Sequence, residues 1–155
     1  MTELSPTPVV PARHVPARGQ ATTSHLFRLS GDDRASARLR AWLSIHLRRW
    51  NLEQLADDLL LIGAELSSNA RRHGAGASTV AVTLRRNAYG RATVRLDVTD
   101  AGPGFDSAAV ARGWYDPDRM EACGGRGLLL VSELSRRWGN GLVAGRHRVW
   151  AEIAE

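Results

Sequence analysis

Regularly spaced hydrophobic residues after Asn51 give the strongest secondary-structure signal in the chain. Leucine and isoleucine side chains recur there every three or four positions, at Leu52, Leu55, Leu59, Ile62 and Leu66. This spacing predicts an amphipathic helix with one buried face, capped at its start by Asn51 and ended by Gly74 and Gly76. The same spacing of leucines predicts an earlier helix over residues 33–50.

Alternation of apolar and polar residues predicts strands in the second half of the chain. Residues 78–86 and 93–99 both show it, and the Asn87–Gly90 segment between them can form a hairpin loop. Shorter strands are expected over residues 25–29, 141–144 and 148–153, with a last helix over residues 127–137. Helices and antiparallel strands in separate runs predict an α+β fold, a two-layer α/β sandwich.

Two segments stand apart from this pattern. Residues 1–23 contain four of the six prolines and few large apolar groups, so we expect a disordered tail followed by one domain over residues 24–155. Residues 105–124 contain glycine and proline and predict a long irregular connection with room for one helical turn. Long loops of this kind often cover a binding site.

Composition excludes several classes of protein. No apolar run approaches the roughly 18 residues that a membrane span needs, and no secretory pattern opens the sequence, so we expect a cytoplasmic protein with no membrane partner. The net charge is +5, and every basic residue other than histidine is arginine. A chain without lysine cannot contain a GxxxxGK[ST] phosphate loop or a lysine base. The arginines occur as pairs without interleaved aromatic residues, so direct nucleic-acid binding is not expected.

The end of the second predicted helix carries the first candidate site, in the segment ELSSNARRHG. Glu65 and Asn69 are four positions apart, so both side chains project from one edge of the helix. An amide oxygen can complete the shell of Mg²⁺, and a carboxylate can act as a base. Arg72 and His73 follow one turn later and could contact phosphate. The alternative is an ordinary polar helix edge with cations at its C-terminus.

Two glycine-rich segments are the other candidates. Asp100 ends a predicted strand before Gly102 and Gly104, where a carboxylate can accept a hydrogen bond from an exocyclic amine such as that of adenine. The alternative is a DxGxG surface turn. Gly125 and Gly127 precede an apolar helix, and free amides at a helix start can bind phosphate, although this signal is weak alone.

Together, ELSSNARRHG, DVTDAGPGFD and GGRGLLLVSELSRRWG resemble the N, G1 and G2 boxes of the GHKL ATPase superfamily. The small stand-alone branch, bacterial anti-sigma factor serine kinases of the RsbW and SpoIIAB type, is the most similar. This resemblance implies a Bergerat-type sandwich with a mixed, mainly antiparallel sheet, which holds ATP and Mg²⁺ beneath a lid over residues 105–124.

The resemblance also implies a role for each matching residue. Glu65 would be the catalytic base and Asn69 the Mg²⁺ ligand, while Arg72 and His73 would lie at the nucleotide. Asp100 would bind adenine above Gly102 and Gly104. The phosphates would be bound by Gly125, Arg126, Gly127 and Leu128.

The function implied is a serine/threonine protein kinase in a partner-switching system. Its partners would be a sigma factor and an anti-sigma antagonist, and the antagonist would be the phosphorylated protein. A homodimer is compatible with the resemblance. The alternative is a non-catalytic, nucleotide-controlled module that sequesters a regulatory partner. A fragment of a repair or topoisomerase-like ATPase is a weaker third hypothesis, because 155 residues leave no room for a transducer domain.

Overall fold

A computed structural model describes residues 21–74, 76–114 and 126–155. The elements are β1 (Ala21–Leu29), α1 (Ala35–Arg49), the 3-10 turn η1 (Glu53–Leu55), α2 (Ala56–His73), β2 (Ser78–Arg86), β3 (Ala92–Asp100), α3 (Ser107–Gly113), α4 (Arg126–Leu134), β4 (Arg137–Val143) and β5 (Arg146–Ala154). No helix in the described ranges is long and apolar enough to span a membrane.

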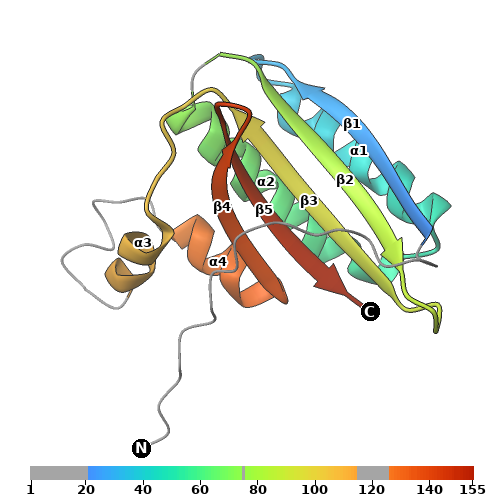
Figure 1. The fold of residues 1–155 in the computed structure, drawn as a ribbon. Coiled ribbons are helices and arrows are strands. Elements are labelled where there is room, and N and C mark those ends of the chain that lie inside the picture. The colour runs from blue at the N-terminus through green and yellow to red at the C-terminus, as the bar shows by residue number, and fades with distance from the viewer. Residues whose placement is uncertain (1–20, 75, 115–125) are drawn as a thin grey trace, which may run out of the picture.

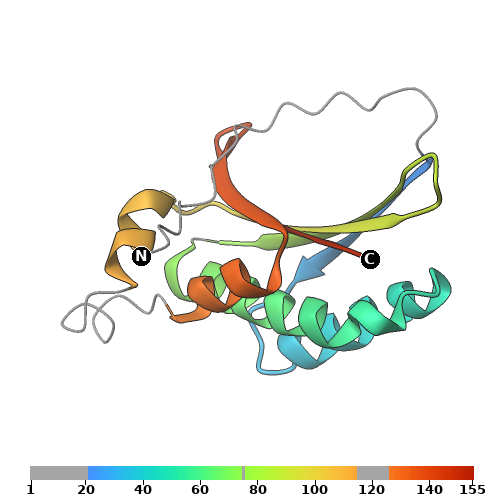
Figure 2. The same ribbon diagram turned by 90° about the horizontal axis from the view of Figure 1, so that it is seen from below.

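The strands form one five-stranded sheet in the order β1-β2-β3-β5-β4. Helices α1, α2 and α4 lie along one face of it, which gives two layers (Figures 1 and 2). The predicted α+β sandwich is therefore confirmed. All four described pairings are antiparallel, so the sheet is more uniform than the mixed arrangement expected. Short hairpins join β2 to β3 and β4 to β5, and such loops can connect only antiparallel neighbours.

The core lies between α2 and the sheet. The five apolar positions of the predicted helix are all buried, with Leu59 and Ile62 fully inaccessible. Opposite them, cross-strand neighbours Val82, Leu96 and Ala151 form a row across β2, β3 and β5. The apolar side chains that alternate along the strands thus pack against the apolar face of the helix and form one layer.

Several predicted boundaries are corrected. Asn51 does not cap α2: it adopts a left-handed φ of 55° just after α1, and α2 is entered through η1. Gly74 is the C-cap of α2, as predicted. Strand β1 begins at Ala21 because it pairs with β2 along its whole length, so residues 21–23 belong to the sheet. Residues 1–20 of the predicted tail lie outside the described ranges.

The C-terminal elements also differ from the prediction. Helix α4 ends at Leu134, and β4 begins at Arg137, so the last residue of the predicted helix lies in a strand. Pairing with β5 explains this boundary, because the backbone N–H of Arg136 donates to the carbonyl of Glu152 at 2.8 Å. The predicted irregular connection contains α3, which Asp106 caps through its carboxylate.

The sheet face opposite the helices carries a buried ion-pair cluster. Glu152 is 3% exposed and contacts the guanidinium groups of Arg85, Arg95 and Arg137 at 2.6, 3.2 and 2.6 Å. Burial alone would raise the pKa of Glu152, but the hydrogen bond and charge of Arg137, with the neighbouring arginines, hold the pKa below its ordinary value. Arg95 also covers the ring of Trp150 at 4.1 Å.

A cluster of aromatic rings joins β1 to α1. His25 stacks on His46 with ring centroids 4.0 Å apart, and Trp42 and Trp50 flank His46. Burial, together with the charges of His25 and Arg49, lowers the pKa of His46. His46 therefore belongs to the core in its neutral form.

Candidate functional site

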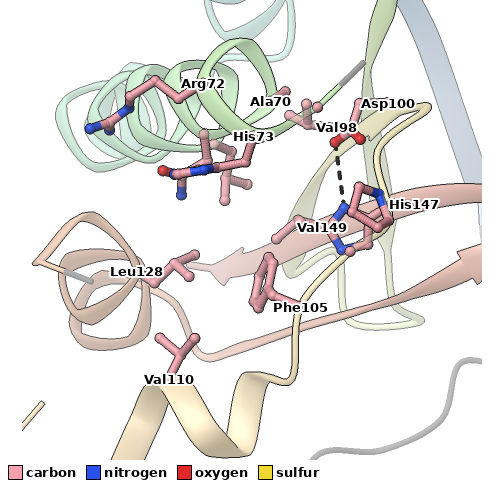
Figure 3. A pocket seen from close by; sticks show the side chains of 15 residues that line it. Ala70, Arg72, His73, Val98, Asp100, Phe105, Val110, Leu128, His147 and Val149 are labelled. Carbon is pink, nitrogen blue, oxygen red and sulfur yellow. Dashed lines mark hydrogen bonds and ion pairs between the residues drawn. The ribbon is translucent and has the colours of Figure 1, made fainter. Parts of the chain in front are cut away.

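A cavity of about 500 Å³ opens between the C-terminal turns of α2, the ends of β3 and β5, and the segment that leads into α3 (Figure 3). It is lined by Leu66, Asn69, Ala70, Arg72, His73, Gly74, Val98, Asp100, Pro103, Gly104, Phe105, Val110, Leu128, His147 and Val149. Its size lies within the range of small-molecule sites, and most of its walls are apolar.

Asp100 is the buried acid of this cavity, with 4% of its surface exposed. It is the last residue of β3, so the end of the strand fixes its backbone. Its Oδ1 accepts a hydrogen bond from the Gly102 backbone N–H at 2.7 Å. Its Oδ2 faces Nδ1 of His147 at 3.4 Å, the contact drawn in Figure 3. The carboxylate is thus held by the protein and retains lone pairs for a ligand.

Two glycines let the chain turn tightly behind this acid. A Cβ atom on Gly102 would lie 2.8 Å from Oδ1 of Asp100 and 2.9 Å from the carbonyl oxygen of His73. Gly104 has a φ of +81°, and a Cβ atom there would lie 2.8 Å from the His147 ring. Neither position accommodates a side chain, because backbone and buried groups already occupy the space. Gly102 contacts Asp100 through its backbone N–H and does not line the cavity, whereas Gly104 does.

Asn69, Arg72 and His73 contribute the α2 side of the cavity. In Figure 3 the guanidinium group of Arg72 extends away from Asp100. Arg72 thus lines the cavity without directing its charge at the Asp100 carboxylate. Among the described residues, no group of three or more His, Cys, Asp and Glu side chains could hold a metal ion by itself.

Only one of the described residues of α4 predicted to bind phosphate lines the cavity. Leu128 of α4 lines the cavity, whereas Glu65, Arg126 and Gly127 do not. A Cβ atom on Gly127 would collide with the Glu65 carboxylate, so α2 and the first turn of α4 are in direct contact. Gly125 lies outside the described residues. The two motifs are thus neighbours through Glu65 and Gly127.

Sequence reasoning missed His147, Phe105 and Asn140. His147 lies on the inward side of β5, in step with Val149, Ala151 and Ile153, and is 5% exposed. A polar residue at an inward position of a strand is the signal in the sequence that indicates such a role. Phe105 packs edge-on against the His147 ring, with centroids 5.2 Å apart.

These features define what the cavity can bind. Apolar walls suit a flat ring, and a fixed carboxylate accepts a hydrogen bond from an amine on that ring. Arg72 and His73 suit a negatively charged extension of the same ligand.

A family model that matches the chain agrees with the sequence motifs. The family model described as histidine kinase-like ATPase domain matches residues 29–140, a range that includes α2, Asp100 and α4. No curated protein matches the chain. One similar solved structure is the SiaB–SiaC complex from Pseudomonas aeruginosa, with 18% identity and a TM-score of 0.47, covering 84% of this chain and 89% of that one.

Proposed function

Because the chain belongs to the histidine kinase-like ATPase domain family, within the GHKL superfamily, we propose that its cavity binds ATP with adenine at the Asp100 end. The observation that carries this proposal is the buried Asp100 carboxylate, which Gly102 holds ready to accept the adenine amine. Val98, Val149 and Phe105 provide apolar contacts for the base.

The same orientation directs the phosphates toward Arg72, His73 and the first turn of α4. Arg126 would contribute charge there, and Gly127 and Leu128, with Gly125 before them, would contribute backbone amides. Asn69 lines the cavity with an amide oxygen, a donor that suits Mg²⁺. Bound Mg²⁺ would neutralise phosphate charge.

The reaction we propose is phosphoryl transfer to a serine or threonine of an anti-sigma antagonist, in a partner-switching system that also includes a sigma factor. Glu65 accepts the proton of the attacking hydroxyl, whose oxygen forms a bond to the γ-phosphorus. The bond between the γ-phosphorus and the bridging oxygen breaks, and ADP leaves. Glu65 belongs to α2 and contacts the first turn of α4, the turn toward which the phosphates are proposed to extend.

A specific observation favours the alternative, a non-catalytic module that sequesters a partner under nucleotide control. The Glu65 carboxylate is directed at Gly127 and does not line the cavity. A carboxylate in that position could brace α4 without contacting a substrate.

Replacing Glu65 separates the two functions. Glu65→Gln, incubated with γ-labelled ATP, Mg²⁺ and a cognate antagonist, is expected to lower transfer by about 100-fold or more, the usual contribution of a general base. Calorimetry should show nearly unchanged ATP affinity. Glu133→Gln alters an exposed glutamate of α4 and is the matched control.

If the native chain binds ATP but transfers no phosphate, the kinase is excluded and the module is supported. If Glu65→Gln transfers phosphate at the native rate, another group is the base. If the native chain does not bind ATP, both functions fail.

A further inference from the structure

We infer that Asn140 and His147 are positioning residues, which hold Asp100 as a pure hydrogen-bond acceptor and so make the pocket select adenine over guanine and hypoxanthine. The inference deepens the proposed function and rests on it for the identity of the ligand. Asn140 is in β4 and His147 in β5, so neither belongs to the motifs that suggested ATP binding.

The chain of contacts begins at a group whose role is unambiguous. The backbone carbonyl of Phe105 can only accept a hydrogen bond, and Nδ2 of Asn140 lies 2.7 Å from it. This contact fixes which end of the Asn140 amide is the nitrogen, a choice that geometry alone leaves open.

The orientation of Asn140 then determines the state of His147. Nδ2 of Asn140 also lies 3.3 Å from Nε2 of His147, and an amide nitrogen can only donate. Nε2 must therefore be the acceptor, which places the proton of the neutral ring on Nδ1. Free neutral histidine prefers the opposite tautomer, so the protein imposes this one.

The imposed tautomer acts on Asp100. Nδ1 of His147 faces Oδ2 of Asp100 at 3.4 Å, and the Gly102 N–H donates to Oδ1 at 2.7 Å. Each carboxylate oxygen thus faces one protein donor and keeps lone pairs for a ligand. A carboxylate attracts the amine of adenine and repels the carbonyl oxygen that guanine and hypoxanthine carry at the same position.

Packing leaves this arrangement little freedom. The side chains of His147 and Asp100 are 7% and 5% exposed, and the Phe105 ring stands edge-on against the imidazole. Phe105 also directly precedes Asp106, the cap of α3. The positioning residues therefore link the base-binding acid to the start of the segment that leads into α3.

Nuclear magnetic resonance of the histidine ring nitrogens tests the tautomer without any ligand. The full chain is expected to show His147 as the Nδ1–H form. Asn140→Leu removes the donor at Nε2, so a larger share of the ring should adopt the Nε2–H form that free histidine prefers. A native His147 in the Nε2–H form, or a ring unaffected by Asn140→Leu, would overturn the inference.

Base selectivity gives the second readout. We expect the native chain to prefer ATP over inosine triphosphate by about tenfold or more, as a site built around one hydrogen-bonded group does. His147→Leu should reduce that ratio to about threefold or less, whereas His147→Asn, whose amide can donate from near the Nδ1 position, should restore much of it. His25→Leu, which removes an imidazole outside the cavity, is the control.

An unchanged ratio in a folded His147→Leu protein would refute the role in selectivity. Thermal unfolding of each variant separates that outcome from misfolding, and the His147→Asn protein provides a second test if His147→Leu does not fold. If the native chain binds neither nucleotide, the proposed function fails, while the tautomer still decides whether His147 positions Asp100.

Discussion

Glu152 illustrates how much one residue can contribute on the face of a sheet opposite its helices. Its carboxylate is buried and balances three guanidinium groups, two of which belong to the largely covered Arg85 and Arg95. Glu152→Gln should therefore lower the free energy of unfolding by about 3 kcal/mol at pH 7, because Arg85 loses its buried partner, whereas Arg95 keeps its ion pair with Asp97. Urea unfolding measures this change, with exposed Glu133→Gln as the control.

The depressed pKa of Glu152 also predicts how stability depends on pH. A carboxylate whose folded pKa lies below its ordinary value of 4.5 stabilises the fold above that pH, and the contribution is lost as pH falls through the folded pKa. Unfolding measured from pH 7 to pH 3 should show this loss, with a shallower slope below 4.5 for Glu152→Gln. Equal slopes would mean that other carboxylates cause the acid sensitivity.

His46 predicts a second pH effect in a different window. Its folded pKa lies below the ordinary value of 6.5, so below that pH the unfolded chain binds a proton that the folded chain excludes. Stability should therefore decrease as pH falls below 6.5. His46→Phe keeps an aromatic ring among Trp42 and Trp50 and should flatten the stability profile between pH 6.5 and 5. A decline identical to that of the native chain would assign the effect elsewhere.

Asp100→Ala tests the acid of the cavity directly. Loss of a charged hydrogen-bond acceptor should weaken ATP binding by about 1.5 to 3 kcal/mol. Calorimetry gives the affinity, and thermal unfolding checks that the turn at Gly102 survives the loss of its acceptor. Native affinity in a folded variant would show that the base lies elsewhere.

Between elements, the contact of α2 with α4 depends on Gly127. Gly127→Ala inserts a methyl group into the Glu65 carboxylate, so α4 or Glu65 must shift. We expect a loss of stability of about 1 to 3 kcal/mol, as for other overpacked sites, together with weaker ATP binding. The control is Gly113→Ala, since a Cβ atom there meets nothing within 4 Å.

A double variant identifies the cause. Glu65→Ala removes the group that Gly127→Ala strikes, so the pair should be more stable than the sum of the single changes predicts. Additive losses would indicate that Gly127 is needed for its backbone conformation instead.

The elements that sequence alone predicted well are those whose signal is local. Helix α2 follows from the spacing of its leucines, and β2 and β3 follow from strict alternation beside a hairpin loop. The start of β4 could not be predicted in this way. Arg137 is paired with Glu152, fifteen positions later, and only the folded sheet brings them together.

The residues of the candidate site show the same difference between local and long-range signals. Asp100, Asn69 and Gly104 belong to compact motifs, so their spacing indicated them as candidates, and all three line the cavity. The tautomer of His147 depends instead on Asn140 and on a backbone carbonyl at Phe105, from three separate segments. No sequence spacing encodes such a relation.

For the whole molecule, nucleotide binding should appear as added stability. At free Mg²⁺-ATP of about 100 times Kd, the fold should gain about 2.7 kcal/mol. For a domain of this size the corresponding rise in Tm is roughly 5 to 10 °C. Differential scanning calorimetry measures it, and Asp100→Ala should show a much smaller rise at the same nucleotide concentration. An unshifted native Tm would argue against a nucleotide site.

The cavity draws its walls from Leu66 in α2, Val98 in β3 and Val149 in β5, and β3 and β5 are neighbours in the sheet. Cutting the chain in the Asn87–Gly90 hairpin would leave α2 on one fragment and both Asp100 and His147 on the other. Neither piece could hold a ligand on its own, yet the ligand should draw the two together. The protein could thus serve as a split reporter, whose reassembly signals the presence of its nucleotide.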